Sequence, residues 1–169
     1  MKTYTLGFLF KNKNTIILAK KMRKGKVGEG KYNGYGGRIE EGEEKIECLV
    51  RETEEECGVE LDKENCKELG LVDFHFENKE DIGQRVYIYR IDDYEGEPKE
   101  TEEMGNPQEF DVSKIPYEEM MLGDDEFVPF VVKGKRFEGK VNFNEDGSKL
   151  LSCEIKEIKD EKTNEIKMK

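Results

Sequence analysis

This chain of 169 residues lacks tryptophan, long apolar runs and closely paired cysteines. No apolar stretch approaches the ~20 residues of a membrane-spanning helix, and the one near the N-terminus is too short for a secretion signal. The cysteines, at positions 48, 57, 66 and 153, include no C-x-x-C pair, which excludes the common zinc and redox motifs. We therefore predict a cytoplasmic protein with free thiols and no membrane partner.

Basic residues are also fewer than acidic ones. The chain has 29 Lys and Arg and 40 Asp and Glu, which gives a net charge of −11. A nucleic acid polymer requires a basic face, so this class of partner is excluded. A single nucleotide stays compatible, since bound Mg²⁺ can bridge protein carboxylates and phosphates. The basic stretch with Lys20, Lys21, Arg23, Lys24 and Lys26 either steers an anionic substrate or is a solvated loop, and the sequence leaves both open.

Charged residues make up 41% of the chain and hydrophobic residues 34%, but the hydrophobic residues are gathered in short runs that can form a core. No internal repeat or long linker divides the sequence. We predict one domain over residues 1–158. Residues 159–169 form a charged C-terminal tail with the composition of a disordered segment.

Short alternating or apolar runs predict mostly antiparallel strands. The predicted strands are a hairpin over 4–10 and 15–19, a second hairpin over 69–76 and 85–91, a short strand over 109–112, and a last hairpin over 136–155 that turns at Asp146–Gly147. The basic, glycine-rich residues 20–37 are predicted to be irregular. The only histidine, His75, is interpreted as a partly exposed strand residue.

Helical periodicity is clearest over residues 43–57. Ile46, Leu49, Val50, Thr53 and Cys57 recur at spacings of three and four and form one apolar stripe. Gly58 is a natural helix stop, and shorter helical segments are predicted over 115–121 and 124–134. Strands and helices intermix without a regular βαβ alternation, so the fold class is α+β with a mixed β-sheet.

Three carboxylates share one face of the predicted helix. Glu52, Glu55 and Glu56 lie at i, i+3 and i+4, away from the apolar stripe, and would repel one another by a few tenths of a kcal/mol per pair. Mg²⁺ or Mn²⁺ prefers oxygen ligands and would hold them together. The alternative is a solvated acidic surface.

The residues around these glutamates form a longer pattern. It consists of Gly37, Glu43, Arg51, Glu52, Glu55, Glu56, Gly58 and the aliphatic Val59. This spacing resembles the signature box of the Nudix hydrolases. The resemblance implies an α/β/α sandwich, in which a loop-helix-loop packs on a mixed β-sheet beside a second helical segment. It also implies hydrolysis of a nucleoside diphosphate linked to another moiety.

The same resemblance implies roles for individual residues. The metal would be Mg²⁺, with Mn²⁺ as a substitute, and its ligands would be the Gly37 carbonyl, Glu52, Glu55, Glu56 and Glu103. Arg51 would orient a glutamate, and Glu43 would support the loop. Either Glu56 or Glu103 would accept the proton of the attacking water, which gives a catalytic set of Glu56, Glu52, Arg51 and Glu103.

Stretches outside the box are similar to one branch of the family. YTL, YNGYGG, TEEMGNPQEF, GDDEFVPF and KRFEGKVNF resemble the MutT-like oxidised purine nucleoside triphosphatases, including 8-oxo-dGTP diphosphatases. The implied reaction converts a nucleoside triphosphate such as 8-oxo-dGTP into the monophosphate and pyrophosphate. The alternatives are a Nudix hydrolase of a nucleotide sugar, dinucleotide or non-oxidised nucleotide, and a non-catalytic nucleotide-binding domain. A monomer is expected, with a dimer as the alternative.

The branch resemblance also implies a base pocket. Its residues would be Asn33, Asp124, Asp125, Phe74, Thr5, Lys21 and Met121. Two neighbouring carboxyls in a partly desolvated pocket raise one pKa, which leaves a protonated donor beside an ionised acceptor for a purine edge. The alternatives are that Asp124 or Asp125 is only a helix N-cap and that Phe74 is only a core residue.

Three departures from the family pattern concern the core and the base pocket. Thr53 replaces an aliphatic residue of the box, so we expect its hydroxyl to bond to a backbone carbonyl one turn back. No tryptophan is available to stack on a base, and Met121 or Leu122 occupies that stretch. Val27 stands where an aromatic residue is usual. These departures affect base discrimination and stability, and leave the metal site intact.

Overall fold

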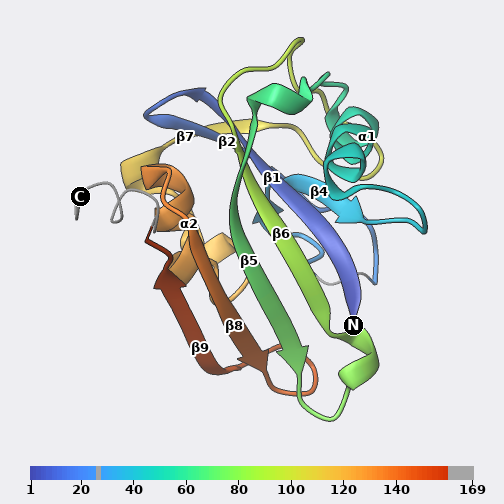
Figure 1. Cartoon of the computed structure of the whole chain (residues 1–169), viewed down its shortest axis with the longest axis vertical. Helices are drawn as coiled ribbons and strands as arrows, with labels where there is room; N and C mark the ends of the chain where they lie inside the picture. Colours follow the sequence, from blue (N-terminus) through green and yellow to red (C-terminus); the bar gives the residue numbers. More distant parts are fainter. Residues whose placement is uncertain (26–27, 160–169) are drawn as a thin grey trace, which may run out of the picture.

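The computed structural model describes residues 1–25 and 28–159. Within these ranges, nine strands form a mixed sheet with the order β3-β2-β1-β6-β5-β8-β9, while β4 pairs with β1 and β7 with β2 (Figure 1). The strands are β1 (Lys2–Asn12), β2 (Thr15–Lys20), β3 (Tyr32–Asn33), β4 (Tyr35–Arg38), β5 (Cys66–Phe76), β6 (Gln84–Ile91), β7 (Gln108–Asp111), β8 (Phe137–Phe143) and β9 (Leu150–Glu157). The expectations for Lys26, Val27 and the tail beyond 159 lie outside the described residues.

The described residues also contain two α-helices and four 3₁₀ turns. These are α1 (Lys45–Cys57), α2 (Asp124–Lys133), η1 (Lys63–Asn65), η2 (Glu80–Ile82), η3 (Val112–Lys114) and η4 (Tyr117–Glu119). The segment predicted as helical over 115–121 is therefore a single 3₁₀ turn. No helix in this part of the chain is both long and apolar enough to cross a membrane.

The sheet is mixed because hairpins are joined by parallel pairs. The three predicted hairpins are confirmed as the antiparallel pairs β1–β2, β5–β6 and β8–β9. The last of them turns at Gly147, whose φ is 77°. The parallel pairs β1–β6 and β5–β8 connect the hairpins across the chain. The α+β class and the mixed sheet are confirmed.

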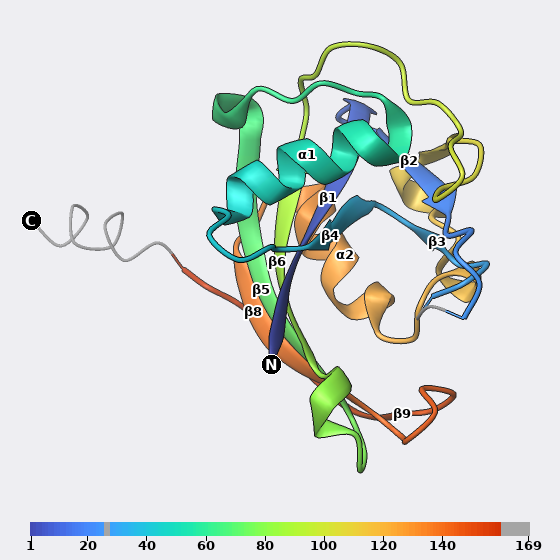
Figure 2. The ribbon, with the colours of Figure 1, turned by 90° about the vertical axis from the view of Figure 1, so that its right-hand side faces the viewer.

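Alternating residues of the central strands build a separate core on each face of the sheet. On β1, Phe8 and Phe10 belong to the core that α2 covers with Phe127, whereas Leu9 belongs to the core that α1 covers with Leu49. Each face therefore carries one helix, which is the α/β/α layering expected of the fold. In Figure 2, α1 runs alongside β4 and β1.

The boundaries of α1 follow from local chemistry. Glu44 and Glu47 form a reciprocal capping box at its start, and Gly58 adopts the left-handed conformation at its end. The stripe is buried at Leu49, Thr53 and Cys57. The predicted hydrogen bond of Thr53 is wrong, because its buried hydroxyl has no partner in the described structure. A carbonyl of this helix can accept a second bond, as the Thr53 carbonyl does from the Cys57 thiol at 3.2 Å.

The described residues between 21 and 31 contain only turns and isolated bridges, as predicted. The prediction of irregular structure is wrong for residues 32–37. They contain β3 and most of β4, and β4 pairs with β1 through Thr5–Gly37 and Leu6–Gly36. A Cβ at Gly36 would overlap the Thr5 carbonyl, so the close pairing of these strands depends on glycine. Gly34 and Gly36 therefore serve a close backbone approach, whereas Gly25, Gly28 and Gly30 have positive φ values and lie in turns. The four cysteines are free, as expected, and two of them are buried.

Candidate active site

Three carboxylates from two segments converge at the end of α1. Oxygens of Glu52, Glu56 and Glu103 all lie within 4.8 Å of one another. Glu52 and Glu56 come from successive turns of the helix, and Glu103 comes from the connection between β6 and β7. The sequence predicted all three residues, and the fold brings them together.

Thr101 holds the segment that carries Glu103. Its hydroxyl donates to the Glu56 carbonyl at 2.8 Å and accepts the backbone N–H groups of Glu103 and Met104, each at 3.3 Å. The Glu103 carbonyl in turn accepts the N–H of Met22 at 2.9 Å. The sequence interpretation missed Thr101, although a threonine two residues before a functional glutamate is a local turn signal.

Glu56 is a buried carboxyl with only 5% of its surface exposed. Burial raises its pKa to about 8, and the nearby charges of Glu52 and Glu103 act in the same direction. The N–H of Gly36 donates to it at 2.8 Å and partly opposes this rise. The expectation that all three box glutamates face away from the core is therefore wrong for Glu56, because β4 covers that side of the helix.

Arg51 lies between the loop and the helix glutamates. Its guanidinium donates two hydrogen bonds to Glu43, at 2.8 and 2.9 Å, and one to Glu52 at 2.8 Å. These bonds lower the pKa of Glu43 to about 2 and raise that of Arg51. Burial raises the pKa of Glu52, while Arg51 opposes the change. This geometry fixes the orientation of the Glu52 carboxylate.

Glu55 lies at the edge of this network. Its side chain is 52% exposed, and its carboxylate is 3.5 Å from Arg51. It does not belong to the group formed by Glu52, Glu56 and Glu103. Its role as a metal ligand stays a prediction.

The donor set fits a hard divalent cation. Three carboxylates supply anionic oxygens, and uncompensated burial of such a group is unfavourable. The backbone of Gly37 also approaches the cluster, since a Cβ there would lie 2.5 Å from the carboxyl carbon of Glu52. Oxygen ligands of this kind suit Mg²⁺ or Mn²⁺ better than a soft metal.

A cleft extends from the carboxylate cluster along the sheet face that α2 covers. Its empty volume is about 780 Å³ when the open solvent at its mouth is included. Glu56 lines one part, the apolar face of β5, β6 and β8 forms a wall, and Asp124 and Phe127 of α2 line another part. The lining residues that the sequence predicted are Thr5, Lys21, Asn33, Gly37, Glu56, Phe74, Met121 and Asp124.

Several of these residues are held by defined contacts. Thr5 is 2% exposed, and its hydroxyl lies 3.3 Å from the Cys48 sulfur. The side-chain oxygen of Asn33 accepts the backbone N–H of Gly34 at 2.8 Å, which leaves the side-chain nitrogen of Asn33 available as a donor. The sequence interpretation missed other lining residues, chiefly Gln84, Val86, Phe127 and Phe143, because strand pairing places them here.

Asp124 is 4% exposed and lies in the first turn of α2. Burial raises its pKa to about 8; Asp125 adds to the rise and a backbone hydrogen bond at Met121 opposes it. The N-cap alternative is wrong for both aspartates, because the N-cap is Gly123 and no side chain caps the helix. Gly123 takes that place because its φ of 96° favours glycine. Asp125 is exposed and does not line the cleft.

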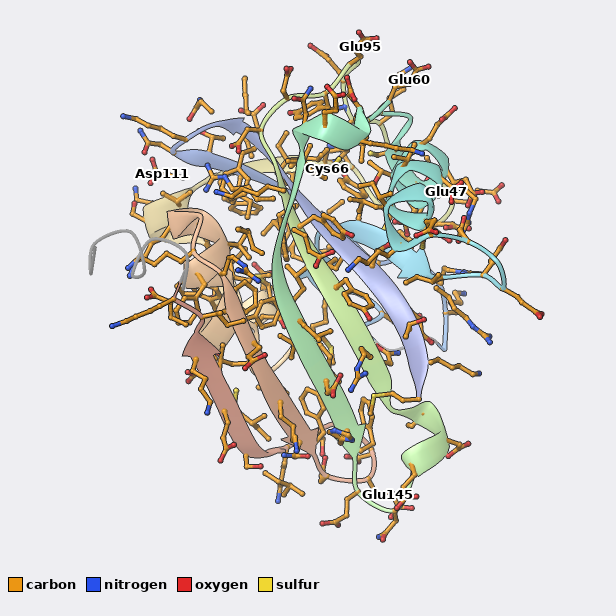
Figure 3. The ribbon with its side chains drawn as sticks, viewed as in Figure 1. Glu47, Glu60, Cys66, Glu95, Asp111 and Glu145 are labelled. Atoms are coloured by element: carbon orange, nitrogen blue, oxygen red, sulfur yellow. The ribbon has the colours of Figure 1, made fainter. Side chains whose placement is uncertain are left out.

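Many of the remaining acidic residues are surface groups. Figure 3 shows Glu47 on the outer side of α1, and Glu60 and Glu95 together at one end of the molecule, where their backbones exchange hydrogen bonds. His75 is half-buried on β5, as expected. Of the two residues in the stretch that lacks a tryptophan, Met121 lines the cleft, whereas Leu122 is 47% exposed.

Comparison with known proteins gives a consistent family relationship. A sequence model of the NUDIX domain matches residues 2–150. An oxidized purine nucleoside triphosphate hydrolase of Danio rerio is 38% identical over 122 residues, which cover 72% of this chain and 76% of that protein. The Mus musculus protein of the same name is 30% identical over 157 residues, which cover 93% of this chain and 96% of that protein.

Solved structures show the same fold. A MutT protein from Bacillus halodurans superimposes with a TM-score of 0.77 at 23% identity, covering 92% of this chain and 97% of that one. A MutT protein from Methanosarcina mazei gives a TM-score of 0.66 at 18% identity, covering 79% of this chain and 94% of that one.

Proposed function

Because the chain belongs to the NUDIX domain family, we propose that it is a metal-dependent pyrophosphohydrolase of oxidised purine nucleoside triphosphates. It would convert a substrate such as 8-oxo-dGTP into the monophosphate and pyrophosphate. The observation that carries this proposal is a single cleft in which the buried carboxylate Glu56 and the buried carboxyl Asp124 both take part. The relatives from Danio rerio and Mus musculus, named for this activity, support the substrate class.

Nudix hydrolases use divalent cations, and we propose Mg²⁺ here, with Mn²⁺ as a substitute. Glu52, Glu56 and Glu103 would hold the metal, together with the Gly37 carbonyl and Glu55 at its edge. When bound, such an ion neutralises phosphate charge and activates water for attack on phosphorus.

The residues of the chain would position the reacting groups. Arg51 holds the Glu52 carboxylate through a 2.8 Å hydrogen bond and is itself fixed by Glu43. Thr101 keeps Glu103 beside the end of α1. Glu56 or Glu103 would accept the proton of the attacking water, because both lie in the carboxylate cluster.

At the base end, Asp124 would donate a hydrogen bond from its protonated carboxyl, and Asn33 would donate from its amide nitrogen. Phe74 and Met121 would contact the base faces, while Thr5 and Lys21 would complete the pocket. We also infer that residues 1–158 form one domain that acts as a monomer.

The test is a panel of kcat/KM values with Mg²⁺ for 8-oxo-dGTP, 8-oxo-dATP, 2-hydroxy-dATP, dGTP, dATP and ADP-ribose, with pyrophosphate and monophosphate measured as products. We expect the oxidised triphosphates to be preferred by at least about tenfold. Equal values for dGTP and 8-oxo-dGTP would contradict the oxidised substrate class. Preference for ADP-ribose would place the chain in another branch of the family.

The buried carboxyl of Asp124 predicts a pH-dependent stability. Its pKa of about 8 in the folded state exceeds the ordinary value of 3.8, so the folded state binds more protons between these values. Stability should therefore fall as the pH rises from about 4 to 8. Asp124→Asn removes this ionisation, and the difference in Tm from the wild type should grow by roughly 5 °C from pH 5 to pH 8.

Thermal unfolding at four pH values between 5 and 8 measures this difference. Asp125→Asn is the matched control, because the exposed Asp125 is a lesser cause of the raised pKa than burial. It should keep most of the wild-type pH dependence. A constant difference in Tm between Asp124→Asn and the wild type would show that Asp124 is ionised in the fold at neutral pH.

A further inference from the structure

One polar side chain interrupts the apolar wall of the cleft. Gln84, the first residue of β6, lines the cleft beside Phe74 and Val86. It is half-buried, and its carboxamide has no hydrogen-bond partner within residues 1–25 and 28–159. A carboxamide offers an acceptor oxygen and a donor nitrogen, so both groups are available to a ligand in the cleft.

Gln84 and Asp124 lie on opposite sides of Phe74 in the cleft. Strands β6, β5 and β8 lie side by side (Figure 1). Gln84 pairs with Phe74, and Phe74 pairs with Val141, so the three residues form one row across these strands. A Cβ on Gly123 would lie 3.2 Å from Cγ1 of Val141. The backbone just before Asp124 therefore packs against Val141, at the opposite end of this row from Gln84. Two strand spacings amount to about 10 Å. This spacing between the backbones of β6 and β8 is comparable to the length of a purine with a hydrogen bond at each end, and both Gln84 and Asp124 line the cleft.

We propose that Gln84 recognises the oxidised five-membered ring of an 8-oxopurine, an inference that rests on the proposed function. In such a base, N7 carries a hydrogen and C8 carries a carbonyl oxygen, so a donor lies next to an acceptor. The Gln84 oxygen accepts from N7–H, and its amide nitrogen donates to the C8 oxygen. The opposite edge of the base faces Asp124.

Unoxidised purines cannot form this pair of bonds. Their N7 is only an acceptor and their C8 carries a hydrogen, so the carboxamide oxygen finds no donor and one bond at most is formed. Gln84 therefore distinguishes oxidised from normal purines at the atom where oxidation occurs. Its placement supplies base discrimination in a cleft that has no tryptophan.

The experiment compares Gln84→Met and Gln84→Glu with the wild type on four substrates. The nucleotides 8-oxo-dGTP and 8-oxo-dATP carry the N7–H and C8 carbonyl pair, whereas dGTP and 2-hydroxy-dATP do not. Methionine keeps the approximate shape without polar atoms, and glutamate keeps an acceptor without the donor. The kcat/KM ratios of 8-oxo-dGTP to dGTP and of 8-oxo-dATP to 2-hydroxy-dATP should each fall about tenfold in both variants.

Gln108→Met is the matched control, because Gln108 lies on β7 and does not line the cleft. Both ratios should keep their wild-type values in this variant. Unchanged ratios in the two Gln84 variants would overturn the inference, even if all rates fell together, since that pattern indicates a purely structural role. Failure of the wild type to hydrolyse 8-oxo-dGTP would instead refute the proposed function, and the inference with it, before any variant is compared.

Discussion

Replacing Glu56 with glutamine should lower kcat by on the order of 10³-fold. Glu56 is 5% exposed and belongs to the carboxylate group with Glu52 and Glu103, so the substitution removes an anionic ligand and a candidate proton acceptor together. Glutamine has nearly the same shape, and its side-chain oxygen can still accept the N–H of Gly36. Steady-state release of pyrophosphate from 8-oxo-dGTP at saturating Mg²⁺ measures the effect.

The Glu56→Gln variant should fold normally, which separates chemistry from stability. A buried amide costs less to desolvate than a carboxylate, so its Tm in metal-free buffer should equal or exceed that of the wild type. Glu54→Gln is the matched control, because Glu54 is an exposed residue of the same helix. It should keep wild-type kcat. More than a tenth of wild-type kcat in Glu56→Gln would remove Glu56 from the catalytic centre.

The sequence predicted those parts of the fold whose signals are local. Alternating residues specified the hairpins, and periodicity with a terminal Gly58 specified α1 to within two residues at its start. The parallel pairs β1–β6 and β5–β8 join segments that are distant in the sequence, so no local pattern could reveal them. Strand β4 was missed because Gly36 and Gly37 have low strand propensity and pair only by virtue of their small size.

The part of the site that lies on one helix could be predicted from the spacing of its residues. Glu52 and Glu56 are one turn apart, so their proximity follows from helix geometry alone. The burial of Glu56 could not be predicted, since it depends on β4 lying over that face of α1. The position of Gln84 could not be predicted for the same reason. It reaches the cleft through its pairing with Phe74, and nothing in its neighbouring sequence indicates a pocket.

The second large effect is expected for Gly37→Ala, which should lower kcat/KM by about 10²-fold while the fold is retained. Gly37 has no left-handed backbone conformation, so alanine introduces no backbone strain. Its Cβ would lie 2.5 Å from the carboxyl carbon of Glu52 and 2.7 Å from both carboxylate oxygens. That carboxylate ends a flexible side chain and can move aside, but it then leaves Glu56 and Glu103.

Three alanine variants distinguish this displacement from a general effect of filling a glycine site. Gly36→Ala should lower Tm strongly, because its Cβ would overlap the Thr5 backbone, which cannot move without breaking the pairing of β1 and β4. Gly105→Ala should keep both activity and Tm, since the nearest atom to its Cβ is 3.5 Å away. Gly37→Ala should keep Tm within a few degrees and require more Mg²⁺ for half-maximal rate, because only the position of Glu52 has changed. Full activity of Gly37→Ala would contradict the placement of the Glu52 carboxylate in the metal centre.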